Sequence, residues 1–166
     1  ERAPMCGVPY HAALSYIGRL VSKGHKVAVC EQMEDPALAK GIVKRDIVRI
    51  YTPGTVTDEQ MLSQKRNNFI AAIFEFRNMY GISAADITTG EMYLTSLTVG
   101  STYNHLANEI ARFTPSEIII NAQAQSVHKI KNFASTLGNS YVATLSEDLF
   151  DYENGKKPST NLIIHG

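Results

Sequence analysis

The sequence has 166 residues, 44% of them hydrophobic, which is enough for one or two small globular domains with their own cores. Its net charge is zero, but residues 1–53 carry eight basic and five acidic side chains whereas the remainder carries eight and eleven, so only the first part is expected to approach a polyanion. No apolar stretch approaches the roughly 20 residues of a membrane-spanning helix and no signal peptide is visible, which excludes a membrane-spanning protein and favours the cytoplasm.

The first third of the chain predicts a helix followed by a strand. Apolar side chains recur at Leu14, Ile17 and Val21, which is the spacing of one helical face, and Gly24 is placed to end the helix. Residues 26–32 alternate as in a strand.

Residues 36–66 predict a short helix, a second strand and a linker. Pro36 suits the first turn of a helix that extends to Lys40, and residues 47–52 are rich in β-branched side chains, as in a strand. Pro53-Gly54 then breaks the backbone. Residues 57–60 have the form of a capping box, which predicts a short helix as far as residue 65 within a linker of residues 56–66.

Residues 67–166 predict a second domain of the α/β class. Strands are expected at residues 69–74, 80–87 and 91–97, followed by a helix that Ser101 would cap, a strand at 117–121, a helix at 124–137 and a strand at 141–145. The first strand is apolar on both faces, as in the centre of a sheet. Three meandering strands followed by helix, strand, helix and strand are the ribonuclease-H-like order of an α/β layer fold. Residues 154–159 are polar and predict a loop.

Four segments of the first third resemble, in their order and spacing, the MutS family of bacterial DNA mismatch-recognition proteins. They are Pro4-Met5-Cys6-Gly7-Val8-Pro9-Tyr10-His11-Ala12, Ala28-Val29-Cys30-Glu31-Gln32, Glu34-Asp35-Pro36 and Val48-Arg49-Ile50-Tyr51-Thr52-Pro53-Gly54-Thr55. The resemblance implies that residues 1–55 are the C-terminal part of a mixed α/β mismatch-recognition domain (domain I). Residues 67–166 would then be the ribonuclease-H-like connector domain (domain II). The family's aromatic wedge lies in a Phe-x-Glu motif upstream, and no such motif precedes Pro4, so we expect a piece of the protein without its mismatch-contacting tip.

The resemblance also implies a function in DNA mismatch repair. The parent protein is expected to recognise and bind mismatched base pairs and small insertion/deletion loops in double-stranded DNA, to form a homodimer and to recruit MutL. ATP and Mg²⁺ would belong to an ATPase domain of the parent that is absent from this chain, since the sequence has no Gly-x-x-x-x-Gly-Lys-Ser/Thr loop. We expect no enzymatic activity, cofactor or metal site in residues 1–166.

Four residues are expected to bind DNA because they match the family. Met5 would make an apolar contact with sugars or a base step, the alternative being a side chain that fills a core gap. Tyr10 and His11 open a helix whose free N–H groups suit a phosphate oxygen, and a packing role at the helix start is equally ordinary. Arg49 is expected to contact a phosphate rather than remain a solvated strand charge.

A metal-dependent nuclease and a pure protein-interaction module are the alternative functions. Nucleases of the ribonuclease-H-like fold bind metal ions through converging carboxylates, and Asp86 and Glu91 flank a predicted hairpin. Asp86 is more simply explained as the cap of the turn that follows it. The histidines are scattered without metal-ligand spacing. Cys6 and Cys30 lie in separate apolar segments, which predicts reduced, buried thiols.

Overall fold

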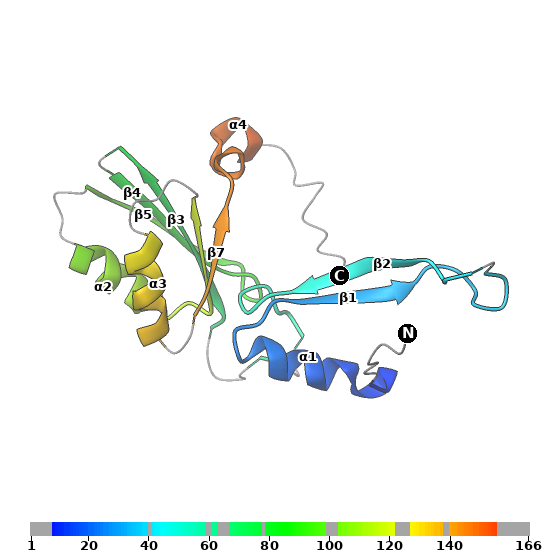
Figure 1. Cartoon of the computed structure of the whole chain (residues 1–166). Helices are drawn as coiled ribbons and strands as arrows, with labels where there is room; N and C mark the ends of the chain where they lie inside the picture. Colours follow the sequence, from blue (N-terminus) through cyan, green and yellow to red (C-terminus); the bar gives the residue numbers. More distant parts are fainter. Residues whose placement is uncertain are drawn as a thin grey trace.

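The computed structural model of the protein describes residues 8–39, 41–58, 61–62, 67–77, 79–98, 103–121, 127–137 and 140–155. Within these ranges the chain forms two α/β units that lie next to each other, a first unit of residues 8–58 and a second unit of residues 67–155 (Figure 1). The α/β class expected from the sequence is therefore confirmed. No helix in the described ranges is long and apolar enough to cross a membrane.

The first unit is a helix packed along an antiparallel ribbon (Figure 1). A 3-10 helix, η1 (Tyr10–Ala12), runs into α1 (Ala13–Val21), and strand β1 (Val27–Gln32) pairs with β2 (Arg45–Tyr51). The helix and both strands agree with the sequence prediction. Side chains from α1, from the end of β2 and from the segment after it form a small core of Ile17, Val21, Tyr51 and Val56.

Two sequence predictions for the first unit are wrong. The chain after Pro36 forms a turn instead of a helix, closed by the Leu38 N–H, which donates to the Asp35 carbonyl at 3.0 Å. The Asp35 carboxylate accepts the Ala37 N–H at 2.9 Å, and an aspartate that bonds the backbone two residues on favours a turn. Cys30 is a free thiol but is exposed rather than buried. It lies on strand β1 of the ribbon, where most residues are exposed.

The linker between the units is described only in part. Of the helix expected after the capping box, Thr57, Asp58, Met61 and Leu62 are described, and the Met61 N–H donates to the Asp58 carbonyl at 2.9 Å to close a turn. The other residues of that expected helix, and the expected cap Ser101, lie outside the described residues.

The second unit is a five-stranded mixed sheet with two helices packed on one face (Figure 1). Its elements in chain order are β3 (Phe69–Phe76), β4 (Met79–Asp86), β5 (Glu91–Thr98), α2 (Tyr103–Phe113), β6 (Glu117–Asn121), α3 (Val127–Thr136) and β7 (Tyr141–Leu145). The strand order is β5-β4-β3-β6-β7, with β3 to β5 antiparallel and with β6 and β7 parallel to β3. Every strand and helix in this series agrees with a sequence prediction, and β3 is central, as its two apolar faces indicate.

The chain after β7 departs from the sequence prediction. It forms a 3-10 helix, η2 (Glu147–Phe150), and a short helix, α4 (Tyr152–Gly155), so the expected loop begins inside a helix. Residues 156–159 of that loop lie outside the described residues. The Phe150 ring stacks on Phe74 with ring centroids 5.4 Å apart, which holds the segment against the sheet.

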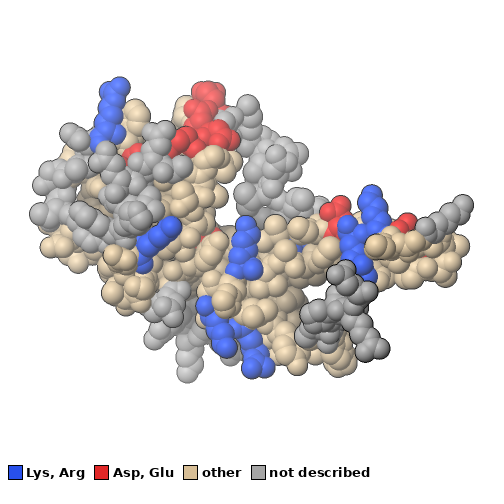
Figure 2. All heavy atoms as spheres, viewed as in Figure 1, with Lys and Arg blue, Asp and Glu red and all other residues tan. Residues whose placement is uncertain are grey.

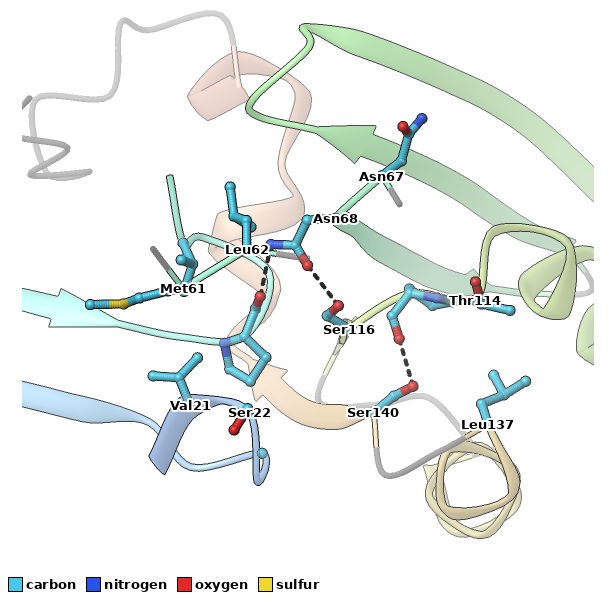
Figure 3. A pocket seen from close by; sticks show the side chains of 14 residues that line it. Val21, Ser22, Met61, Leu62, Asn67, Asn68, Thr114, Ser116, Leu137 and Ser140 are labelled. Atoms are coloured by element: carbon cyan, nitrogen blue, oxygen red, sulfur yellow. Dashed lines mark hydrogen bonds between the residues drawn. The ribbon is translucent and has the colours of Figure 1, made fainter. Parts of the chain in front are cut away.

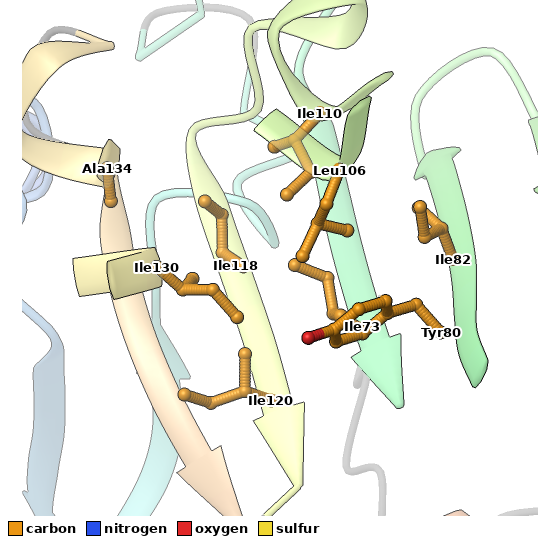
Figure 4. Close-up of a cluster of buried hydrophobic side chains, with 9 residues drawn as sticks. All are labelled: Ile73, Tyr80, Ile82, Leu106, Ile110, Ile118, Ile120, Ile130 and Ala134. Atoms are coloured by element: carbon orange, nitrogen blue, oxygen red, sulfur yellow. The ribbon is translucent and has the colours of Figure 1, made fainter. Parts of the chain in front are cut away.

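One apolar core joins the sheet to the helices (Figure 4). Ile73 of β3, Ile118 and Ile120 of β6 and Ile130 of α3 are all fully buried. Burying each such side chain contributes about 1.5–3 kcal/mol relative to leaving it exposed. This core gives the second unit a stable frame against which the first unit rests.

Asp86 caps the turn between β4 and β5, as predicted. Its Oδ1 accepts both the N–H and the hydroxyl of Thr88, at 2.8 and 2.6 Å, and its Oδ2 accepts the Asn68 N–H at 2.9 Å. Burial raises the pKa of the Asp86 carboxyl, but these hydrogen bonds outweigh it and hold the pKa below its ordinary value. Gly90 adopts φ 75° to complete the turn.

We predict that amide hydrogens in β3 and β4 exchange more slowly than those in β1. β3 is hydrogen-bonded on both sides and contains the fully buried Ile73, whereas β1 belongs to a two-stranded ribbon with mostly exposed residues. Two-stranded ribbons are marginal on their own and open at low free energy. Native-state hydrogen exchange followed by mass spectrometry measures this, and equal protection of β1 would contradict it.

Asp86 is expected to make the second unit less stable in acid. Because its folded pKa is lowered, its contribution is fully present above the unfolded pKa of about 3.9 and is lost as the pH falls through the folded pKa. Asp86→Asn leaves one acceptor oxygen for donors on both sides and should lower the free energy of unfolding by about 1–3 kcal/mol at pH 7. Urea unfolding measures this, and the free energy of unfolding should differ less between pH 7 and pH 3 in this variant than in the parent. Glu31→Gln, which changes an exposed carboxylate, should leave that difference unchanged.

Candidate nucleic-acid interface

Basic side chains lie along the helix and the ribbon of the first unit (Figure 2). In the described part of this unit they are Arg19, Lys23, Lys26, Lys44, Arg45 and Arg49. Five acidic side chains accompany them, namely Glu31, Glu34, Asp35, Asp46 and Asp58. The surface therefore carries both signs of charge, with a small positive excess. The acidic residues of η2 and α4 lie on the second unit, far from the ribbon (Figure 2).

The helix formed by η1 and α1 begins at Tyr10 without a side-chain cap. Neither η1 nor α1 has a side-chain hydrogen bond at its N-cap, where Pro9 and Ala12 lie, and no acidic residue occupies the first turn of either helix. The Ala12 and Ala13 N–H groups donate to the Pro9 and Tyr10 carbonyls, so η1 closes the start of α1 and the exposed end of the helix is η1 itself. Tyr10 is 89% exposed, and His11 beside it is exposed as well. The positive end of a helix dipole favours a phosphate or carboxylate oxygen at such a position.

Arg49 has intramolecular partners that sequence reasoning missed. Its Nη2 lies 3.5 Å from the Asp58 Oδ2, and its guanidinium lies 4.5 Å from the centroid of the Tyr51 ring. The Asp58 Oδ2 is buried and has no hydrogen bond within the described part of the chain. Burial, together with the Asp58 charge and Tyr10, raises the pKa of the Tyr51 hydroxyl, although Arg49 opposes the rise. The only signal in the sequence was an acidic residue shortly after the Pro53-Gly54 turn.

The structure describes three of the four expected DNA-binding residues. Arg49 lies on β2 with its guanidinium over the Tyr51 ring, and Tyr10 lies on η1. His11 follows Tyr10 on η1. Met5 lies outside the described residues, as does Cys6. A role of all four residues in DNA binding stays a prediction.

The carboxylates considered for a nuclease have structural roles. Asp86 and Glu91 face each other across the β4–β5 hairpin, but Asp86 is occupied by Thr88 and Asn68, and the Glu91 Oε2 accepts a hydrogen bond from the Asn67 amide at 3.0 Å. No group of three His, Cys, Asp or Glu residues within the described ranges is arranged to hold a metal ion. The geometry therefore favours turn capping over metal binding at Asp86.

Comparison with known proteins defines the class. A family model described as MutS domain I matches residues 1–60, and one described as MutS domain II matches residues 68–160. A protein named DNA mismatch repair protein MutS from Ruminiclostridium cellulolyticum is 54% identical over 154 residues, which are 93% of this chain and 18% of that protein. Proteins of the same name from Acetivibrio thermocellus and Clostridium botulinum are 53% and 45% identical over 92% and 97% of this chain, and it covers 18% and 17% of them.

These matches place two successive domains of a DNA mismatch repair protein on the two units of the fold. The chain belongs to the MutS family. It spans less than one fifth of the length of the curated relatives it matches.

Asp58 is expected to compete with DNA phosphate for Arg49. Arg49→Ala should weaken duplex binding roughly tenfold at low salt, by removing one charge-assisted contact. Asp58→Asn should strengthen binding by roughly 1.5- to 5-fold, because it breaks a partly exposed ion pair and frees the guanidinium. Glu31→Gln removes the same charge from the ribbon without touching Arg49. Fluorescence anisotropy would contradict the interpretation if Asp58→Asn bound DNA no better than Glu31→Gln.

Proposed function

We propose that this chain is the part of a mismatch repair protein that holds duplex DNA with its first unit and relays binding through its second. The observation that carries the proposal is the match of MutS domains I and II, in that order, to the two units. The start of η1 has no side-chain cap and exposes Tyr10 and His11, which supplies a surface suited to phosphate oxygens. Arg49 adds a guanidinium at the base of the ribbon.

The whole protein would recognise mismatched base pairs and small insertion/deletion loops in double-stranded DNA. In this proposal it acts in the cytoplasm as a homodimer, couples recognition to ATP and Mg²⁺ at an ATPase domain outside these residues, and recruits MutL. The support is the name shared by relatives that are about half identical to the chain over more than 90% of its length. No step of ATP hydrolysis is assigned to the residues of this chain.

The second unit would serve as the ribonuclease-H-like connector domain. Its strand order, with a central strand flanked by an antiparallel meander on one side and two parallel strands on the other, supports that assignment. Acidic side chains outnumber basic ones in its described part, which suits contact with other protein domains better than contact with a polyanion. DNA contact is accordingly assigned to the first unit.

The chain is expected to bind paired and mismatched duplexes equally and weakly. Of the four residues assigned to DNA, Tyr10, His11 and Arg49 are assigned to phosphates and Met5 to sugars or a base step, and phosphate contacts position a protein without specifying a base. Affinity should fall steeply with salt, and Arg49→Ala should reduce the slope of log K against log salt by about 0.9. An anisotropy titration with a paired and a G·T-containing duplex at several salt concentrations measures both effects.

Lys131→Ala provides the matched control, because it removes one exposed positive charge from α3 in the second unit. Its salt slope should equal that of the parent chain. A lower slope for this variant, or a clear preference for the G·T duplex, would contradict the assignment of phosphate contacts to the first unit.

A further inference from the structure

The turn that leaves the DNA-contacting ribbon is buried, which is unusual for a connection between elements. Residues 51–54 are all buried, and they include the Pro53-Gly54 break that follows β2. They lie against β3 and β6 of the second unit through Ile70 and Glu117. A segment that the sequence presents as a flexible break is thus a docked contact.

Glu117 is the acceptor at the centre of this contact. It begins β6 and is 4% exposed, and its Oε2 accepts hydrogen bonds from the Thr52 hydroxyl and, at 3.0 Å, from the Gly54 N–H. The Thr52 and Thr55 hydroxyls are 2.7 Å apart and join the same network. A carboxylate that accepts several buried donors fixes the direction of each one.

Only glycine fits at position 54. A Cβ there would lie 2.9 Å from the Cβ atoms of both Ile70 and Glu117 and 3.1 Å from the Glu117 Oε2. Any larger residue would push the turn away from the sheet and lengthen both hydrogen bonds to Glu117. Gly54 is therefore selected by close approach of the two units.

Asn68 provides a further hydrogen bond across the same contact, to Pro53, and is itself held in place by two bonds within the second unit (Figure 3). Its Nδ2 donates to the Pro53 carbonyl at 2.9 Å, its Oδ1 accepts the Ser116 hydroxyl at 2.7 Å, and its N–H donates to Asp86 at 2.9 Å. Beside these bonds the units leave a hollow of about 370 Å³, lined by residues of both (Figure 3). The hydrogen bonds to Glu117 and Asn68 are directional, so they constrain the relative orientation of the units.

We propose that Glu117 and the Thr52–Gly54 turn form a rigid joint that fixes the ribbon relative to the second unit. Glu117 is then a positioning residue, which transmits a displacement of the ribbon to the five-stranded sheet instead of letting the linker absorb it. The rigidity follows from the contacts themselves, whereas the use of the joint to relay DNA binding rests on the proposed function.

Distance distributions between two spin labels test the joint directly. One label is attached to Cys30, the exposed thiol of the ribbon, and the other to a cysteine introduced by Leu94→Cys on β5, at a side chain that is 74% exposed. Cys6→Ser keeps the other thiol from reacting. Double electron–electron resonance should give a narrow distribution in the parent, and Glu117→Gln should retain it, because the amide oxygen still accepts both donors.

Glu117→Ala, Thr52→Val and Gly54→Ala should each lose the narrow distribution and give a broad one. Asn121→Ala is the matched control, since Asn121 is buried on the same strand but its hydrogen bonds within the described part of the chain go to Glu75 and Glu147 of the second unit. It should destabilise the sheet and leave the distribution narrow. The three variants change three different residues of the joint. If one of them does not fold, the distance distributions of the other two still test the proposal.

A broad distribution in the parent, or narrow ones in the folded Glu117, Thr52 and Gly54 variants, would overturn the joint. Broadening in Asn121→Ala as well would reduce the role of Glu117 to general stability. A parallel anisotropy titration separates the two proposals, because Glu117→Ala leaves every residue of the ribbon intact and should bind duplex with parental affinity. Absence of DNA binding in the parent would remove the proposed function and leave the distance result standing.

Discussion

The structure depends first on the burial of β3. This strand has neighbours on both sides and an apolar residue at nearly every position, and Ile73 at its centre has no exposed surface. A strand of this kind is stable only when helices or chain cover it on both faces. Helices α2 and α3 cover one face, while η2 places Phe150 on Phe74 of the other. The same strand supplies Ile70, against which the Gly54 turn rests.

The first unit depends on the second more than the second depends on it. Its described core is small, and several large apolar side chains of α1 and β2 remain substantially exposed. They are Leu14, Tyr16, Leu20, Ile47 and Ile50. The buried bonds to Glu117 and Asn68 therefore anchor a unit whose own hydrophobic burial is limited.

The two units differ in charge and in the exposure of their polar groups, and this difference agrees with the match to MutS domains I and II. The small positive excess and the uncapped start of η1 belong to the first unit, and the buried polar contacts that join it to the sheet leave these groups at the surface. Arg49 forms its ion pair with Asp58, which belongs to the segment that leads toward the second unit. The residue proposed to contact phosphate therefore lies close in the chain to the contact between the units.

Local patterns in the sequence predicted most of the helices and strands, because periodicity, β-branched runs and turn residues such as Gly90 act locally, and its motifs identified the family. It also predicted the capping role of Asp86, whose bonds to Thr88 span two residues. Only the tertiary structure shows that Pro53-Gly54 is packed against the second unit and that Arg49 forms an ion pair with Asp58. It also shows that Thr52, within the family motif of residues 48–55, contacts Glu117. Thr52 and Glu117 are 65 residues apart, and no local pattern encodes which distant carboxylate will meet a turn.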